Sequence, residues 1–175
     1  GEWPTIYEGL SQLPEQVQKS WFGFDHYYSD NSFNEALEIV FNNNTKKLLD
    51  VGGNTGRFAL RCVSFNKDVN VTIMDLPQQL EMMRKQVADK EGADRIHGYG
   101  ANLLDENTSF PTDFDAIWMS QFLDCFSEEQ VISILSRAAK SMKEGCSLYI
   151  METLWDRQKF ETAAYCLTQI SLYFT

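Results

Sequence analysis

The fold is decided by residues 47–64, KLLDVGGNTGRFALRCVS, and by residues 69–75, VNVTIMD, which follow them. Each stretch contains a short apolar run of the length expected for a buried strand. In the first stretch, this run leads into a glycine-rich turn and then a helical pattern. A strand, a tight turn, a helix and a second strand form a βαβ unit, which places its two strands parallel in one sheet. The sequence therefore predicts an α/β fold.

The alternation of strands and helices continues along the chain. Further apolar runs predict strands at Arg95–Tyr99, Phe114–Met119 and Ser147–Met151. Helices are expected at 32–41, 57–64, 78–90, 127–142 and 157–175, and the capping boxes Ser32-x-x-Glu35 and Ser127-x-x-Gln130 open two of them. This order is typical of a Rossmann-like, doubly wound, mostly parallel sheet covered on both faces. Such sheets bind ligands at the carboxyl ends of their strands.

The overall charge argues against a nucleic-acid partner. The chain carries a formal net charge of -10 and has a pI of about 4.6. Such a surface repels phosphate backbones.

The sequence shows no signal peptide, and no apolar run approaches the roughly 18 residues that suggest a membrane span. We therefore expect a cytoplasmic protein that binds neither nucleic acid nor membranes.

Cysteine and histidine positions do not indicate a metal site. The four cysteines form no C-x-x-C pair, and the two histidines lie far from them in the sequence. A structural zinc site is recognised by closely spaced ligands of these types. We therefore expect free thiols in a reducing compartment, and no bound metal.

The glycine turn and the acid after the next strand suggest a nucleoside ligand. The segment Asp50–Gly56, DVGGNTG, allows close approach of the backbone to a ligand, but it does not fit the G-x-G-x-x-G pattern of dinucleotide-binding proteins. The chain has no G-x-x-x-x-G-K-[ST] motif either, so nucleotide hydrolysis is not indicated. Asp75 ends the second strand, where a carboxylate can accept hydrogen bonds from both hydroxyls of a ribose.

These segments resemble the motifs of class I S-adenosylmethionine-dependent methyltransferases. Leu48–Gly56 is similar to the first motif of that superfamily, and Met74–Pro77 is similar to the second. Within the superfamily, the chain resembles the caffeate, isoflavone and hydroxyindole O-methyltransferases and their bacterial relatives. The segments that carry this narrower resemblance match in order and spacing: Phe24–Asn34, Ala101–Leu104, Asp124–Glu129 and Glu152.

The resemblance implies a site for S-adenosylmethionine or its product, S-adenosylhomocysteine. It places Asp50 and Gly52 at the methionine end of the cofactor, Asp75 at the ribose, and Asn102 beside the adenine, where the family has an aspartate. Ser120 falls where many members carry a cofactor-contacting lysine, so that contact would be lost. The other residues of the expected cofactor site are Gly53, Leu76 and Leu103.

The catalytic block departs from the family pattern. In the family, the histidine of H-D-W-S-D-E removes the proton of the acceptor hydroxyl, and here Asp124 stands at that position. An ordinary Asp has a pKa of about 3.9, against about 6.5 for His, so Asp124 would need burial to act as the base. Alternatively, Asp124 could orient the acceptor or simply precede the next helix. Glu152, at the position of the family's acidic partner of the histidine, is a second candidate base, and we expect the two carboxylates to face one cavity.

The chain divides into an N-terminal linker or helical segment, residues 1–31, and an incomplete S-adenosylmethionine-binding domain, residues 32–175. The aromatic stretch Trp21–Tyr28 could line an acceptor pocket or pack the first segment onto the domain. The chain stops inside the apolar stretch Leu167–Phe174, so we expect truncation at the C-terminus. The resemblance also implies that the full-length protein forms a homodimer through an N-terminal helical domain.

The leading hypothesis is an enzyme that methylates a hydroxyl of a small, aromatic molecule. Two alternatives stay open at the level of sequence. A nitrogen or carbon acceptor would explain the missing histidine. A protein that binds the cofactor without catalysis, as a regulatory or interaction module, would combine an intact cofactor site with an altered catalytic block.

Overall fold

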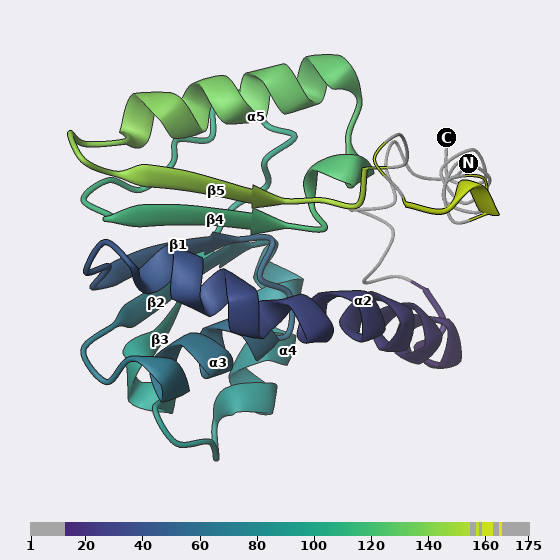
Figure 1. Cartoon of the computed structure of the whole chain (residues 1–175), viewed down its shortest axis with the longest axis horizontal. Helices are drawn as coiled ribbons and strands as arrows, with labels where there is room; N and C mark the ends of the chain where they lie inside the picture. The colour runs from purple at the N-terminus through teal and green to yellow at the C-terminus, as the bar shows by residue number, and fades with distance from the viewer. Residues whose placement is uncertain (1–12, 155–156, 158, 163–164, 166–175) are drawn as a thin grey trace.

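A computed structural model describes residues 13–154, 157, 159–162 and 165 (Figure 1). These residues form a five-stranded sheet with the strand order β3-β2-β1-β4-β5. The strands are β1 (Lys47–Val51), β2 (Asn70–Asp75), β3 (Ile96–Gly100), β4 (Ala116–Ser120) and β5 (Ser147–Met151). Every neighbouring pair of strands is parallel. This order confirms the predicted doubly wound sheet, and its topological switch point lies between β1 and β4.

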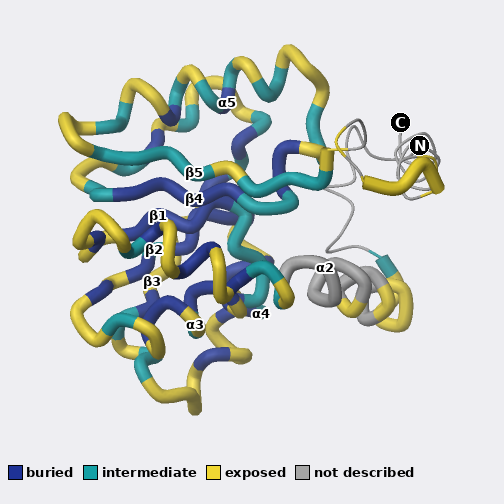
Figure 2. Tube along the Cα trace, in the orientation of Figure 1, coloured by how far each residue is buried: buried dark blue, intermediate teal, exposed yellow. Residues whose placement is uncertain are grey.

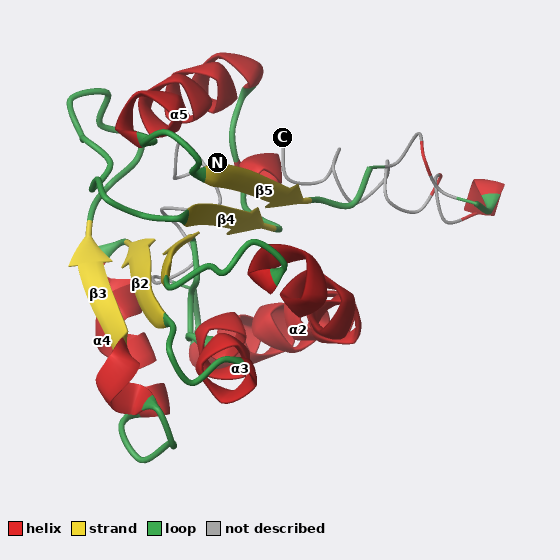
Figure 3. Cartoon of the chain, turned by 60° about the vertical axis from the view of Figure 1, so that its left-hand side comes forward, coloured by secondary structure: helices red, strands yellow, loops and turns green. Residues whose placement is uncertain are grey.

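Helices cover both faces of the sheet, as the alternating pattern predicts (Figure 3). The long helices are α2 (Glu15–Phe41), α3 (Arg57–Phe65), α4 (Pro77–Val87) and α5 (Glu128–Ser141). Apolar side chains of α2, α3 and α4 share one core with Leu48, Val71 and Trp118 of the strands. The opposite face packs Leu49 and Met119 against α5 and against the loop that follows β3. Successive residues of each strand point to opposite faces, so each of the central strands supplies both cores (Figure 2).

In the described part of the chain, two short 3₁₀ helices lie next to the main elements. These are η2 (Ala93–Arg95), which leads into β3, and η3 (Leu123–Cys125), which follows β4. The capping box at the start of α5 is confirmed: the Ser127 hydroxyl accepts the Gln130 N–H, and the Gln130 side chain accepts the Ser127 N–H at 2.9 Å. The helix predicted over 157–175 lies mostly outside the described residues.

The predicted start of the first helix at Ser32 is wrong. Helix α2 begins at Glu15, directly after Pro14, and runs without a break through the residue 31/32 boundary. Ser32 therefore lies inside a helix and cannot act as an N-cap, because a capping residue needs a non-helical backbone. The C-terminal half of α2 is held by four buried side chains at helical spacing, Phe33, Ala36, Leu37 and Val40. Figure 1 shows its N-terminal half extending past the carboxyl edge of the sheet.

Because Phe33 anchors α2 in the core, we expect Phe33→Ala to lower the free energy of unfolding by about 3–5 kcal/mol. Ile39→Ala on the same helix is the matched control, since Ile39 is 59% exposed and its loss should cost less than about 0.5 kcal/mol. Urea unfolding followed by circular dichroism measures both. Equal losses for the two variants would contradict the packing described here.

Candidate functional site

The residues expected to bind a cofactor lie along one edge of the sheet. Because all strands are parallel, their carboxyl ends meet on the same side. Going from β3 to β5, this edge carries the loop after Gly100, then Asp75, the turn after Val51, Ser120 and finally Glu152. The structure therefore gathers at one edge residues that lie more than 100 positions apart in the chain.

The turn after β1 is a tightly hydrogen-bonded loop with a left-handed backbone at several positions. Gly52, Asn54 and Gly56 have φ values of 72°, 49° and 81°. Glycine adopts this conformation at no steric cost, and Asn is among the residues that tolerate it best. The Gly52 N–H donates to the Met74 carbonyl at 2.9 Å, and the Gly56 N–H donates to the Gly53 carbonyl at 2.9 Å. These bonds join the turn to β2 and lead it into α3.

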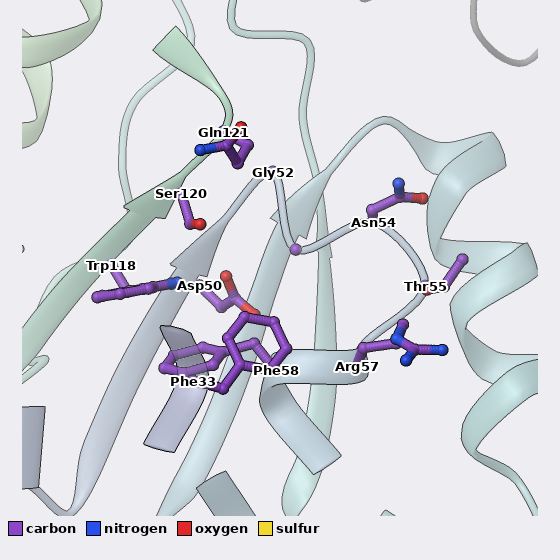
Figure 4. Close-up of a pocket in the computed structure, with 11 residues that line it drawn as sticks. Phe33, Asp50, Gly52, Asn54, Thr55, Arg57, Phe58, Trp118, Ser120 and Gln121 are labelled. Atoms are coloured by element: carbon purple, nitrogen blue, oxygen red, sulfur yellow. The ribbon is translucent and has the colours of Figure 1, made fainter. Parts of the chain in front are cut away.

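A pocket opens between this turn and the end of β4 (Figure 4). Its lining consists of Phe33, Asp50, Gly52, Gly53, Asn54, Thr55, Arg57, Phe58, Trp118, Ser120 and Gln121. Figure 4 shows Gly52, Ser120 and Gln121 together at one end of the pocket, and the rings of Phe33 and Phe58 at the other. The pocket thus combines a polar end with an aromatic end.

The carboxyl group of Asp50 is buried at the floor of this pocket. Asp50 is 2% exposed, and its Oδ2 atom has no hydrogen-bond partner among the residues that the structure describes. Burial, together with the negative charge of Asp75, raises the pKa of Asp50 to about 7. A buried carboxylate without a partner is costly, and a cationic ligand group placed beside it would offset that cost.

Two glycines make room for this arrangement. A Cβ atom on Gly53 would lie 2.6 Å from Oδ2 of Asp50, and a Cβ atom on Gly52 would collide with the ring of Phe122. Any side chain at either position would therefore displace the carboxyl group or the ring. The two glycines are required by close packing as well as by the backbone conformation of the turn.

Asp75 connects the end of β2 to the glycine turn. Its Oδ2 accepts the Asn54 N–H at 2.9 Å, its Oδ1 accepts the Leu76 N–H at 2.7 Å, and the residue is 3% exposed. Both carboxylate oxygens therefore hold backbone N–H groups at the edge of the sheet where a ribose is expected. Asp75 lies beside the pocket and is not part of its lining.

The loop after β3 carries the residues expected near an adenine. Asn102 is half-buried, and its side-chain oxygen accepts the Leu104 N–H at 3.0 Å in a local turn, while Leu103 is buried. Arg137 of α5 holds this loop, because its guanidinium donates to the carbonyls of Leu103 and Thr108 at 2.6 and 2.9 Å. Like Leu76, the loop lies outside the pocket lining, at the same edge of the sheet.

The aromatic end of the pocket joins three elements. The ring of Phe58 in α3 lies 5.0 Å from that of Phe33 in α2 and stacks on Trp118 of β4 at 4.5 Å between centroids. Arg57, at the start of α3, forms an ion pair with Asp30 of α2. Helix α2 therefore contributes directly to the pocket, although it precedes the predicted cofactor-binding strand.

Gln121 is a pocket residue that sequence reasoning missed. It follows Ser120 at the end of β4, with a left-handed φ of 49°. Its Nε2 donates to the Thr153 hydroxyl at 3.0 Å, and its backbone N–H donates to the Met151 carbonyl at 3.0 Å. Its position at the end of a central strand was the signal available in the sequence. Its contact with Thr153, 32 residues away, was not.

Glu152 binds the turn that carries Asp124. Its Oε1 accepts the N–H groups of Phe122 and Leu123, at 3.0 and 2.9 Å. This carboxylate therefore stabilises the start of η3, and Glu152 is not part of the pocket lining. The candidate base role of Glu152 stays a prediction.

Asp124 lies in η3 and is exposed on the surface. Partial desolvation by neighbouring apolar groups raises the pKa of Asp124, and a weak 3.7 Å bond from the Cys125 thiol opposes the rise. Ser127, and not Asp124, caps the following helix, and Asp124 precedes that cap in the chain.

The site fits the cofactor that the resemblance implies. A buried carboxyl group suits the cationic methionine end, Gly52 and Gly53 allow close approach, and Asp75 suits a ribose. Within the described ranges, no three His, Cys, Asp or Glu side chains are grouped so that they could hold a metal ion. The same part of the chain contains no helix that is long and apolar enough to cross a membrane.

Fold and site together define a class I methyltransferase domain. A family model described as the O-methyltransferase domain matches residues 27–174, and the chain belongs to this family.

Two curated relatives illustrate the range of the family. The chain is 21% identical over 154 residues to L-tyrosine C(3)-methyltransferase of Streptomyces lavendulae, a match that covers 88% of this chain and 41% of the relative. It is 28% identical over 154 residues to norreticuline-7-O-methyltransferase of Papaver somniferum, covering 86% of this chain and 40% of the relative. The chain thus spans less than half the length of these relatives.

Solved structures show the same fold. The S-adenosylmethionine-dependent methyltransferase SibL in its apo form superimposes with a TM-score of 0.75 at 23% identity, covering 98% of this chain and 50% of SibL. Mitomycin 7-O-methyltransferase MmcR superimposes with a TM-score of 0.72 at 18% identity, covering 91% of this chain and 46% of MmcR. These similarities confirm the predicted Rossmann-like fold of the class I type.

The raised pKa of Asp50 predicts a pH-dependent stability. The folded protein keeps a proton on Asp50 that the unfolded chain releases at about pH 4, so the free energy of unfolding falls as the pH rises from about 4 to 7. At about 1.36 kcal/mol for each pKa unit, this loss is at most about 4 kcal/mol. Asp50→Asn should remove it, as measured by urea unfolding across this range.

The exposed Asp68 provides the control, and Asp68→Asn should keep the pH dependence of the parent. If Asp50→Asn also kept the full dependence, the assignment of the buried proton to Asp50 would be wrong.

Proposed function

We propose that the protein transfers a methyl group from S-adenosylmethionine to a hydroxyl of a small, aromatic molecule. The observation that carries this proposal is the buried carboxyl group of Asp50, which lies beside Gly52 and Gly53 and would bind a cationic ligand group. The chain also belongs to the O-methyltransferase domain family. When bound, the cofactor supplies an electrophilic methyl group on a positively charged sulfur. The chain's own residues then have to hold that cofactor, orient the acceptor and accept a proton.

The proposed cofactor contacts follow the order of the strands. Asp50 and Gly52 hold the methionine end, and Asp75 binds the ribose hydroxyls. Asn102 lies at the adenine side, on the loop that Arg137 clamps. Gly53, Leu76, Leu103 and Ser120 complete the contacts. These assignments are supported by the shared edge of the sheet and by the burial of both carboxylates.

A proton has to leave the acceptor hydroxyl, because a phenol with a pKa of about 10 attacks poorly while it is protonated. We propose Asp124 as the group that accepts it, with the raised pKa of Asp124 in support. Glu152 is the second candidate for the group that accepts this proton. The two N–H bonds that Glu152 accepts also give it a positioning function, since they hold the turn that presents Asp124.

Methyl transfer to carbon is the second candidate reaction. Two relatives, L-tyrosine C(3)-methyltransferase and bacteriochlorophyllide d C-20 methyltransferase of Chlorobaculum tepidum, are named for carbon acceptors. Asp124 in place of a catalytic histidine fits this reaction as well. Mass spectrometry of the product separates the two reactions, because an O-methyl group and a C-methyl group give different fragments.

The expected homodimer and the cytoplasmic location remain proposals about the whole protein.

Cofactor binding tests the proposal directly. We expect the protein to bind S-adenosylhomocysteine in calorimetry and to give no heat with NAD. Asp75→Ala should weaken binding by about 1.5–3 kcal/mol, because it removes charge-assisted bonds to the ribose. Asp124→Ala should leave the affinity unchanged and serves as the matched control. A folded protein that binds neither S-adenosylmethionine nor S-adenosylhomocysteine would end the proposal.

Kinetics test the proton acceptor. With an acceptor found in a library of aromatic hydroxyl compounds, Asp124→Asn should lower kcat by about 10²–10⁴-fold, the usual contribution of a general base. Glu128→Gln, in the exposed first turn of α5, should leave kcat unchanged. If Asp124→Asn and Glu152→Gln both kept the parent rate, neither carboxylate would be the base. A cofactor-binding protein that methylates nothing in the library would favour the non-catalytic alternative.

A further inference from the structure

The backbone at Gln121 is held in an unfavourable conformation by its surroundings. A left-handed φ is uncommon for a residue other than Gly, Asn or Asp, and such strain persists only where neighbouring contacts enforce it. Here the three successive N–H groups of Gln121, Phe122 and Leu123 all donate to residues 151 and 152. The end of β5 therefore holds the turn after β4 in one shape.

The side chain of Gln121 is held as well. Its Nε2 donates one hydrogen to the Thr153 hydroxyl at 3.0 Å. A primary amide nitrogen carries two hydrogens, so this bond fixes the amide and leaves a second N–H for another acceptor. Backbone strain and a fixed polar side chain occur together at a residue that lines the pocket.

The charged residues of the pocket indicate which ligand groups the Gln121 amide would meet. Asp50 suits a cationic group, and Ser120 and Gln121 lie at the end of the neighbouring strand β4 (Figure 4). Arg57 is the one basic residue in the described lining, and its guanidinium is paired with Asp30. A ligand that places an ammonium group near Asp50 and a carboxylate nearby would find its neutral donors in the Ser120 hydroxyl and the Gln121 amide.

We propose that Gln121, positioned by Thr153, binds the amino-acid end of S-adenosylmethionine by donating its second amide hydrogen to the methionine carboxylate. The inference rests on the proposed function and adds to it a residue for substrate positioning.

Two ligands isolate this contact in calorimetry with the whole protein. S-Adenosylhomocysteine has the amino-acid end, whereas 5′-methylthioadenosine has the same nucleoside and sulfur without the ammonium and carboxylate groups. Gln121→Met keeps the side-chain length and loses the amide. It should weaken the affinity for S-adenosylhomocysteine about tenfold or more, as expected for the loss of a hydrogen bond to a charged group. The affinity for 5′-methylthioadenosine should change less than twofold. Thr153→Val should show the same selectivity with a smaller loss.

Gln121→Gly separates binding from folding. Glycine relieves the left-handed backbone, so Tm should be no lower than that of the parent while the affinity for S-adenosylhomocysteine still falls about tenfold. Asn44→Gly is the matched control, since Asn44 has a φ of 57° in the turn before β1, at the opposite edge of the sheet. It should leave both affinities unchanged.

Three results would overturn the inference. Gln121→Met could bind S-adenosylhomocysteine as tightly as the parent, or it could weaken both ligands equally, which would mean a general distortion of the site. In either case the parent would still bind both ligands, and the proposed function would stand. A parent protein that binds neither ligand would overturn the proposed function, and this inference with it.

Discussion

The burial of one carboxyl group determines how the rest of the site is built. Asp50 points from the centre of the sheet into a pocket with Oδ2 unpartnered, and its charge is opposed both by desolvation and by Asp75. Only glycine fits at position 53, because Oδ2 occupies the space that a side chain would need. A group that costs so much to bury is best explained by a cationic ligand, since the ligand offsets the cost when it binds.

The elements around Asp50 come from distant parts of the chain. The strand order brings β4 beside β1, so Trp118 and Ser120 line the pocket next to Asp50. Helix α2 adds Phe33 and pairs Asp30 with Arg57 at the start of α3. The aromatic cluster of Phe33, Phe58 and Trp118 thus connects α2 to the pocket itself. A change in the packing of α2 would be transmitted to the ligand site through this cluster.

The proposed acceptor side differs in character from the proposed cofactor side. The cofactor side is buried and heavily hydrogen-bonded, whereas Asp124 is exposed on a short 3₁₀ helix whose first N–H groups are held by Glu152. The relatives transfer methyl groups to oxygen in some cases and to carbon in others, as their names state.

The sequence by itself determined the five strands, the parallel sheet, the glycine turn, the two acids Asp50 and Asp75, and the Ser127 cap. Each of these follows from local spacing, because apolar period, glycine position and capping boxes act over a few residues. Only the tertiary structure decided that α2 begins at Glu15, that Glu152 binds the turn after β4, and that Gln121 pairs with Thr153. These features depend on contacts between segments about 30 residues apart, or on core packing that overrides a local signal, as the Ser32 capping box shows.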